Sequence, residues 1–197
     1  MDKIKKQIVC KGIKEYVPKS NPLINVSLFM NSTISQHQCV HIQNLLLTKP
    51  NEYKSFLPQI FSLFPSSCCD PHGNYLVQQI IPLLSRDELI QMTNLVIVYF
   101  KEFYYHNYST RVIQKLIELS NDDNQRLLSP VLLTHLSYLC KDHNGIHIVI
   151  KTVTFFKNSS FVYDYIVSNI EEIAKDKEGC CLIQKILEKV TNNGYVR

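Results

Sequence analysis

The sequence predicts an all-α fold built from a repeated pair of helices. A block with the sequence DPHGNYLVQQII, at 70–81, recurs along the chain with its apolar residues in the same phase. The equivalent positions in the copies of this block are Cys39, Asn74, Thr110, Ile146 and Cys180. Their spacing gives a period of about 35 residues, which is typical of stacked helical repeats. We therefore expect an α-solenoid.

Each copy of the block carries signals for a helix start. Asp70, Asp142 and Asp176 are of a residue type that favours the N-cap position. Pro71 suits the first helical turn, because the missing N–H costs nothing there. The helices that follow are expected to begin near residues 35, 70, 106, 142 and 176.

A second apolar segment precedes three of the blocks, at 87–103, 125–140 and 161–174. Ser85 and Glu88 resemble a capping box for the first of these segments. The β-branched run VIVYF within it permits a strand, but the paired amphipathic pattern favours a helix. Each repeat is therefore expected to be a helix pair.

Composition narrows the class of protein. With 197 residues, 45% of them hydrophobic, the chain can bury a substantial core as one domain or one elongated array. Seven cysteines without a CxxC pair argue against a disulfide framework and a zinc ribbon, which favours a reducing compartment. The longest apolar run, LVIVYF, is far too short to cross a bilayer. A net charge of +4 is compatible with an anionic partner but does not require one.

Polar residues share one face of the helix that begins near residue 70. Asn74, Tyr75 and Gln78 project from this face, while apolar residues project from the other. Two amide side chains one turn apart match the neighbouring donor and acceptor groups on the Watson–Crick edge of a nucleotide base. A ring beside them can stack on the face of the same base. The apolar face is therefore suited to packing, and the polar face to a base.

The run GNYLVQ at 73–78, with TRVIQK at 110–115 and GCCLIQK at 179–185, resembles the RNA-reading helix of the Pumilio (PUF) repeat. In that family each repeat reads one base of single-stranded RNA through side chains of its second helix. The resemblance implies five Pumilio-like repeats over residues 35–197, preceded by an N-terminal cap or partial repeat at 1–34.

The resemblance also implies a role for each matching position. The edge positions, which contact the Watson–Crick edge of a base, are Cys39 with Gln43, Asn74 with Gln78, Thr110 with Gln114, and Cys180 with Gln184. The stacking positions, which lie against the face of a base, are Val40, Tyr75, Arg111, His147 and Cys181. The candidate phosphate contacts, for which a solvated surface is the alternative, are Lys115, Lys151 and Lys185.

The implied target is the RNA core 5′-A-N-A-U-A-3′, because the family binds RNA antiparallel to the protein. Asn74 and Gln78 match the family's uracil reader, and the other pairs of edge positions match its adenine readers. The fourth repeat has Ile146 and Ile150 at its edge positions and is expected to accept any base.

Several features depart from the family pattern. Ser109 and Gln38 stand where the motif has glycine, and Cys181 offers a poorer stacking face than Tyr or Arg. Typical members have eight repeats, whereas this chain ends at Arg197, soon after the fifth. We expect either a fragment or truncated product, or a protein that binds RNA weakly, with micromolar affinity.

Catalysis, metal binding and a cofactor are not expected. The sequence has no nucleophile with a supporting base and no phosphate-cradling loop. His72, His106 and His143 lie at helix starts, where solvation is usual, and Cys68 and Cys69 lack the distant partners of a zinc site.

The sequence therefore predicts a protein that binds single-stranded mRNA in a 3′ untranslated region and regulates it post-transcriptionally or at translation. It would act as a cytoplasmic monomer that recruits repressor or deadenylase-type proteins and makes no use of a membrane. Two alternatives stay open. One is a nuclear or nucleolar factor that binds pre-ribosomal RNA during ribosome assembly. The other is a protein-binding α-solenoid scaffold, which Ile146 and Ile150 favour.

Overall fold

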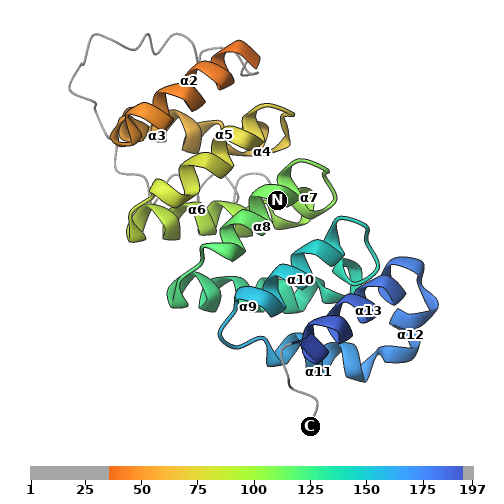
Figure 1. The fold of residues 1–197 in the computed structure, drawn as a ribbon. Coiled ribbons are helices and arrows are strands. Elements are labelled where there is room, and N and C mark those ends of the chain that lie inside the picture. Colours follow the sequence, from red (N-terminus) through yellow and green to blue (C-terminus); the bar gives the residue numbers. More distant parts are fainter. Residues whose placement is uncertain (1–35, 193–197) are drawn as a thin grey trace, which may run out of the picture. The chain divides into compact units, whose positions relative to one another are not determined.

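The computed structural model describes residues 36–192, with side chains from 41 to 190 apart from residues 50 and 56, and it is helical without strands over that range (Figure 1). The all-α prediction is confirmed for this part of the chain. The predicted N-terminal cap at 1–34 lies outside the described residues. The chain divides into two compact units, Met1–Tyr99 and Phe100–Arg197.

The first unit carries the helices of the first repeats. Its described elements are α2 (Gln36–Thr48), η2 (Pro50–Glu52), α3 (Tyr53–Ser62), α4 (Phe64–Cys69), α5 (Gly73–Ile80), η3 (Ile81–Leu83) and α6 (Arg86–Val98). Helix α2 packs on α5, and α4 packs on both α3 and α5.

The second unit continues the same succession. Its described elements are α7 (Phe100–Tyr104), α8 (Ser109–Glu118), α9 (Asp122–Leu139), α10 (Gly145–Phe155), α11 (Ser160–Ser168), α12 (Ile170–Lys175) and α13 (Lys177–Asn192). Helix α10 packs between α8 and α13, and α9 packs on α10 and α11. We call α2, α5, α8, α10 and α13 the reading helices. In each unit they pack against one another, as a stacked repeat requires.

The helix that precedes the reading helix in each predicted pair is broken in two of the three expected segments. The segment 87–103 is interrupted at Tyr99 (φ −105°, ψ 14°), and the segment 161–174 at Asn169 (φ −123°, ψ 21°). These residues leave the helical backbone region and a short helix follows each of them, so both segments are helical, as predicted, but each forms two helices. Only 125–140 matches one continuous helix, α9, which contains Pro130.

The predicted aspartates accept backbone hydrogen bonds just before the reading helices, although the N-cap residues of α5 and α10 are His72 and Asn144 and not Asp70 and Asp142. Asp70 Oδ1 accepts hydrogen bonds from the backbone N–H groups of His72 (2.8 Å) and Gly73 (2.7 Å). Asp142 Oδ1 accepts from the backbone N–H groups of Asn144 and Gly145, and Asp176 Oδ1 accepts from that of Gly179. The regular helix after Asp70 begins only at Gly73, since the residues between form a turn. The caps therefore set where the reading helices begin, with a lag of up to one turn.

The predicted capping box is also present. Ser85 accepts a hydrogen bond from the Glu88 backbone N–H, and the Glu88 carboxylate accepts one from the Ser85 backbone N–H (2.8 Å). The same carboxylate accepts a hydrogen bond from the Tyr53 hydroxyl (3.0 Å), one repeat earlier in the chain. Its pKa lies below the ordinary value, because the hydrogen bonds it accepts outweigh its partial burial. The cap thus also joins two repeats of the first unit.

A close approach of backbones precedes the reading helices. A Cβ placed on Gly73 would lie 2.6 Å from the carbonyl oxygen of Ser67, and one on Gly145 would lie 2.6 Å from that of Leu139. A Cβ on Gly179 would be crowded in the same way by Ile173. In each case the crowding carbonyl belongs to the short helix or helix end just before the turn. Only a residue without a side chain fits there without a shift of the backbone.

Ser109 occupies the glycine position of the third repeat, and the structure explains how it is accommodated. It is fully buried, and its hydroxyl donates a hydrogen bond to the carbonyl oxygen of Phe103 (2.8 Å). Phe103 stands six residues before Ser109, as Leu139 stands six before Gly145. The serine hydroxyl therefore bonds to the carbonyl equivalent to the one that crowds the glycines of the other repeats.

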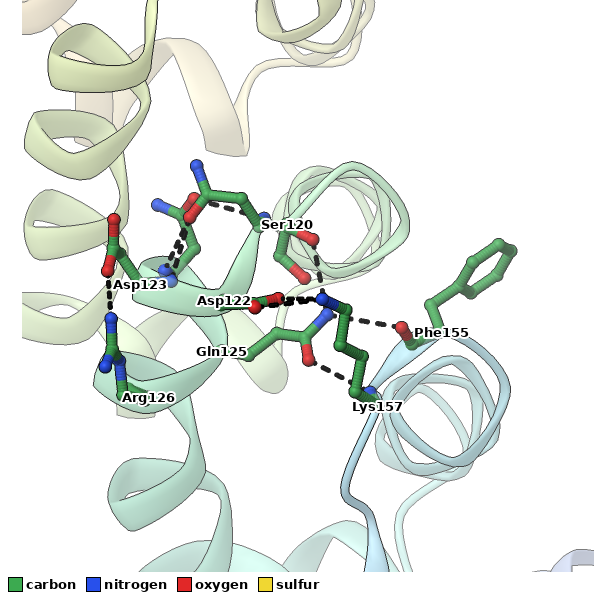
Figure 2. Close-up of polar contacts among 9 residues, drawn as sticks. Ser120, Asp122, Asp123, Gln125, Arg126, Phe155 and Lys157 are labelled. Atoms are coloured by element: carbon green, nitrogen blue, oxygen red, sulfur yellow. Dashed lines mark hydrogen bonds and ion pairs between the residues drawn. The ribbon is translucent and has the colours of Figure 1, made fainter.

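Polar contacts one repeat apart join successive repeats of the second unit (Figure 2). Gln125 Nε2, at the start of α9, donates to the carbonyl oxygens of Ser120 and Phe155, both at 3.2 Å. Gln125 Oε1 accepts from the backbone N–H of Lys157 (3.0 Å), whose ammonium pairs with Asp122 (2.7 Å). Gln125 is buried, so these bonds satisfy its amide and tie the loop after α10 to α9.

The close approach at Gly145 generates the first prediction. Gly145→Ala should lower the free energy of unfolding by roughly 1–3 kcal/mol, because the added methyl would overlap the Leu139 backbone. Urea unfolding followed by circular dichroism measures the change. Thr154→Ala, an exposed site on the same helix, is the control and should change stability by less than about 0.5 kcal/mol. Helix propensity alone would instead make Gly145→Ala stabilising.

Candidate nucleic-acid interface

Each reading helix places its predicted site residues in a row along one side of the helix. Residues at i, i+1, i+4 and i+5 of a helix share one side, so each helix contributes edge, stacking and candidate phosphate positions together. Helices α5, α8, α10 and α13 carry these rows in the described structure. Cys39 and Val40 belong to α2, but their side chains lie outside the described part of the chain.

The first edge position is buried on α5, α8 and α10. Asn74 is 0% exposed, and both Thr110 and Ile146 are 2% exposed. Cys180, on α13, is exposed instead. The sequence could not reveal this burial, because the residues that cover these positions come from elsewhere in the fold.

Asn74 uses its amide inside the protein. Its Nδ2 donates to the carbonyl oxygens of Asp70 (2.9 Å) and Pro71 (3.0 Å), and its Oδ1 accepts from Gln78 Nε2 (2.9 Å). The last bond orients the amide of Gln78, which is half-buried, with Nε2 toward Asn74. Tyr75 between them is 54% exposed. The structure therefore brings the predicted triplet together, with Asn74 holding Gln78 and Tyr75 presented to solvent.

The third repeat repeats this arrangement with a hydroxyl. Thr110 Oγ1 accepts from Gln114 Nε2 (3.4 Å) and donates to the carbonyl oxygen of Asn144 (3.5 Å) at the start of the next reading helix. The Asn144 amide in turn donates to Asn107 Oδ1 (3.0 Å). The first edge position thus lies under the beginning of the following repeat, and the glutamine one turn later is half-exposed.

Two stacking positions of the second unit, on the packed helices α8 and α10, lie within electrostatic reach of each other. Arg111 on α8 is exposed, and His147 on α10 is half-buried. The pKa of His147 lies below its ordinary value, mainly because burial disfavours the imidazolium and then because Lys185 and His143 add positive potential. Arg111 contributes in the same direction, while Glu178 opposes it. Arg111 on α8, Lys185 on α13 and His143 just before α10 therefore lie within electrostatic reach of His147.

The fourth repeat offers little polar chemistry at its edge positions. Ile146 is buried and Ile150 is half-buried, both on α10. His143, at the start of this repeat, is exposed, and its Nδ1 lies 3.5 Å from a carboxylate oxygen of Glu178. The ring of His143 lies edge-on to that of His147, with centroids 6.1 Å apart.

Two of the candidate phosphate contacts share one carboxylate. Lys115 Nζ lies 3.1 Å from Glu118 Oε1, and Lys151 Nζ lies 3.1 Å from Glu118 Oε2. The pKa of the Glu118 carboxyl is held below its ordinary value by hydrogen bonds from Lys151 and Lys115. Lys185, the third candidate, is exposed on α13. Sequence reasoning missed Glu118, although its three-residue spacing from Lys115 is that of a helical ion pair.

Metal and membrane sites find no support in the described residues. Within that part of the chain, no group of three or more His, Cys, Asp or Glu side chains is placed to hold a metal ion. No described helix is both long enough and apolar enough to cross a bilayer.

Comparison with known proteins places the chain among helical-repeat proteins that bind RNA. The model of the Pumilio-family RNA binding repeat matches residues 68–97, 105–129 and 169–193. The chain belongs to the Pumilio family. The three matched segments leave out 130–168, which includes the helix with isoleucines at both edge positions.

Curated relatives of the chain are longer proteins. Pumilio homolog 12 of Arabidopsis thaliana is 25% identical over 159 residues, which cover 77% of this chain and 27% of the relative. Suppressor protein MPT5 of Saccharomyces cerevisiae is 30% identical over 146 residues, which cover 68% of this chain and 17% of the relative. The chain thus spans only a minor part of these relatives.

Solved Pumilio-family structures share the fold. The Puf4 RNA binding domain, bound to the HO endonuclease RNA 3′ UTR recognition sequence, matches with a TM-score of 0.74 and 27% identity over 78% of this chain and 49% of that domain. The RNA-binding domain of yeast Puf5p bound to MFA2 RNA matches with a TM-score of 0.71 and 27% identity, covering 81% of this chain and 47% of that one. The predicted fold class, an all-α solenoid of Pumilio-like repeats, is confirmed.

The burial of Asn74 predicts that it matters for folding as well as for the site. Asn74→Ala should lower the free energy of unfolding by about 1–3 kcal/mol, because it removes an amide that is buried and hydrogen-bonded. Tyr75→Ala, on the exposed side of the same helix, should cost less than about 0.5 kcal/mol. Urea unfolding of both variants tests this, and equal losses of stability would contradict it.

The lowered pKa of His147 predicts a loss of stability in acid. Unfolding restores a pKa of about 6.5, so the unfolded chain binds more protons than the native one below that pH. The stability that His147 contributes is therefore complete above about pH 6.5 and declines as the pH falls from there through the native pKa. His147→Gln should show a smaller drop in urea midpoint between about pH 7.5 and about pH 5.5 than wild type. His41→Gln, exposed on α2, should follow wild type; a drop in His147→Gln as large as that of wild type would refute the assignment.

Proposed function

We propose that this chain binds single-stranded RNA sequence-specifically and regulates mRNA after transcription. The observation that carries the proposal is the joined arrangement of Asn74, Tyr75 and Gln78, in which a buried amide orients a half-exposed one beside an exposed ring. The match to the Pumilio-family RNA binding repeat supports it, as do neighbours of the same fold solved in complex with RNA.

The chemistry of this triplet suits uracil. The base presents an N3–H donor flanked by two carbonyl acceptors, and a glutamine amide carries one acceptor oxygen and two donor hydrogens. Gln78 Nε2 donates to Asn74 Oδ1 (2.9 Å) and to the Asn74 carbonyl oxygen (3.3 Å), so Oε1 is the group of this amide that is left to accept the N3–H of the base. The Tyr75 ring can stack on the base, a contact worth roughly 1–3 kcal/mol.

The same reasoning extends to the implied core 5′-A-N-A-U-A-3′. Thr110 and Gln114 repeat the bonded pair in a smaller form, as a reader of adenine. Ile146 and Ile150 offer no hydrogen bond to a base edge, which leaves the fourth position unselective. His147 is then the group that holds a base there by stacking.

The proposed function is binding without catalysis, carried out by the edge and stacking positions of the reading helices. The chain would act by holding a transcript, in a 3′ untranslated region, for repressor or deadenylase-type proteins in the cytoplasm, and as a monomer. The first alternative is a nucleolar factor for ribosome assembly that selects little between bases. The hydrogen-bonded pair of Asn74 and Gln78 favours a protein that does select a base. The second is a protein-binding scaffold, which the apolar edge of the fourth repeat favours.

Fluorescence anisotropy with labelled RNA tests the proposal. Wild type should prefer AUAUA over the same RNA with guanine at the fourth position by about tenfold, which corresponds to about 1.4 kcal/mol. Tyr75→Ala/Gln78→Ala should lose that preference and some affinity. This pair is chosen because both side chains reach the surface, whereas Asn74 is buried.

Tyr138→Ala, an exposed tyrosine on α9, serves as the control and should keep the preference. Equal and salt-sensitive binding to both RNAs would indicate electrostatic attraction without base reading. Absence of binding to either RNA would favour the protein-binding scaffold.

A further inference from the structure

The carboxylate of Glu118 bridges two successive reading helices. It lies at the C-terminal end of α8 and contacts Lys115 on its own helix and Lys151 on α10, each at 3.1 Å. The three side chains are partly buried, with about one third of each exposed to solvent. One negative charge therefore faces two positive charges from two repeats.

These lysines lie on the side of the helices that carries the stacking positions. Lys115 follows Arg111 by four residues on α8, and Lys151 follows His147 by four residues on α10. Residues four apart on a helix share a face, so each lysine lies one turn beyond a stacking position. Arg111 and His147 also lie within electrostatic reach of each other. The pair of lysines is thus placed where the backbone of a stacked RNA would pass.

The Glu118 charge opposes the use of these lysines by RNA. Phosphate binding to single-stranded RNA gains from each lysine that replaces a counterion. A lysine already paired with a carboxylate contributes less to that gain, and the carboxylate itself repels phosphate. Since Lys151 and Lys115 lower the pKa of Glu118, the carboxylate stays ionised at neutral pH.

We propose that Glu118 competes with RNA phosphate for Lys115 and Lys151, and so limits the affinity of this chain for RNA at the third and fourth repeats. The inference rests on the proposed RNA binding and assigns a role to a residue outside the edge and stacking positions. In it, the carboxylate is a built-in substitute for a phosphate, which RNA must displace. Glu118 thereby sets how strongly the unselective fourth repeat contributes.

Removing the charge of Glu118 while keeping its shape tests the inference. Glu118→Gln should bind AUAUA RNA about 3- to 20-fold more tightly than wild type at moderate salt. The slope of log K against log salt should become steeper by up to about 1.4, the value for two added phosphate contacts on single-stranded RNA. Glu118→Ala is a second variant without the amide and should change affinity in the same direction.

Two controls separate the inference from simpler explanations. Glu171→Gln makes the same change in net charge at an exposed site on α12 and should leave the affinity within about twofold of wild type. The triple variant Lys115→Gln/Glu118→Gln/Lys151→Gln should not bind RNA more tightly than wild type, because it lacks the two lysines that Glu118→Gln alone would make available to phosphate. Urea unfolding of each variant shows whether the bridge acts on stability as well.

The outcomes are distinguishable. Equal gains in Glu118→Gln and Glu171→Gln would overturn the inference in favour of a general charge effect. Weaker binding by Glu118→Gln with a lower urea midpoint would overturn it in favour of a structural clamp between repeats. If neither wild type nor any variant bound RNA, the proposed function itself would fail, and the inference with it.

Discussion

The close approach between the start of a reading helix and the carbonyl six residues earlier is the constraint on which the repeats depend. Gly145 lies so near the Leu139 backbone that an added methyl would overlap it. Because the chain turns this tightly, the aspartate before the turn can cap the helix through its side chain. Ser109 satisfies the same constraint differently, by bonding to the carbonyl it approaches. Glycine is thus one solution to a contact that serine also solves.

That turn also determines how the candidate site is built. The residue after the glycine position is buried. Asn74 donates hydrogen bonds to the carbonyl oxygens of Asp70 and Pro71, and Thr110 donates one to that of Asn144 in the next repeat. Each still bonds the glutamine one turn later. In each pair the buried residue orients the glutamine one turn later, and that glutamine is the partly exposed member. A change at the first of these positions therefore alters folding and binding together.

Charge at the interface is balanced within the protein rather than left free. Lys115 and Lys151 share Glu118, and His143 lies near Glu178, so carboxylates already occupy part of the positive surface that faces the stacking row. Burial and neighbouring cations keep His147 neutral more readily than a histidine in water. The net charge of +4 is therefore a poor guide to the local potential at these side chains, which depends on the pairing of each lysine.

The sequence by itself determined the period, the helical class, the aspartate caps and the grouping of Asn74, Tyr75 and Gln78, because these follow from local rules of helix spacing and capping that act within about one turn. It could not show the break at Tyr99, which was expected to be helical, nor the burial of Asn74 and Thr110. Nor could it show that Lys115 and Lys151 meet at one carboxylate. The burial of Thr110 and the meeting of the two lysines involve contacts between residues about one repeat apart, Thr110 with Asn144 and Lys151 with Glu118, and only packing brings such residues together. Tertiary structure alone therefore decided which of the predicted side chains are held inside the protein and which remain available to a ligand.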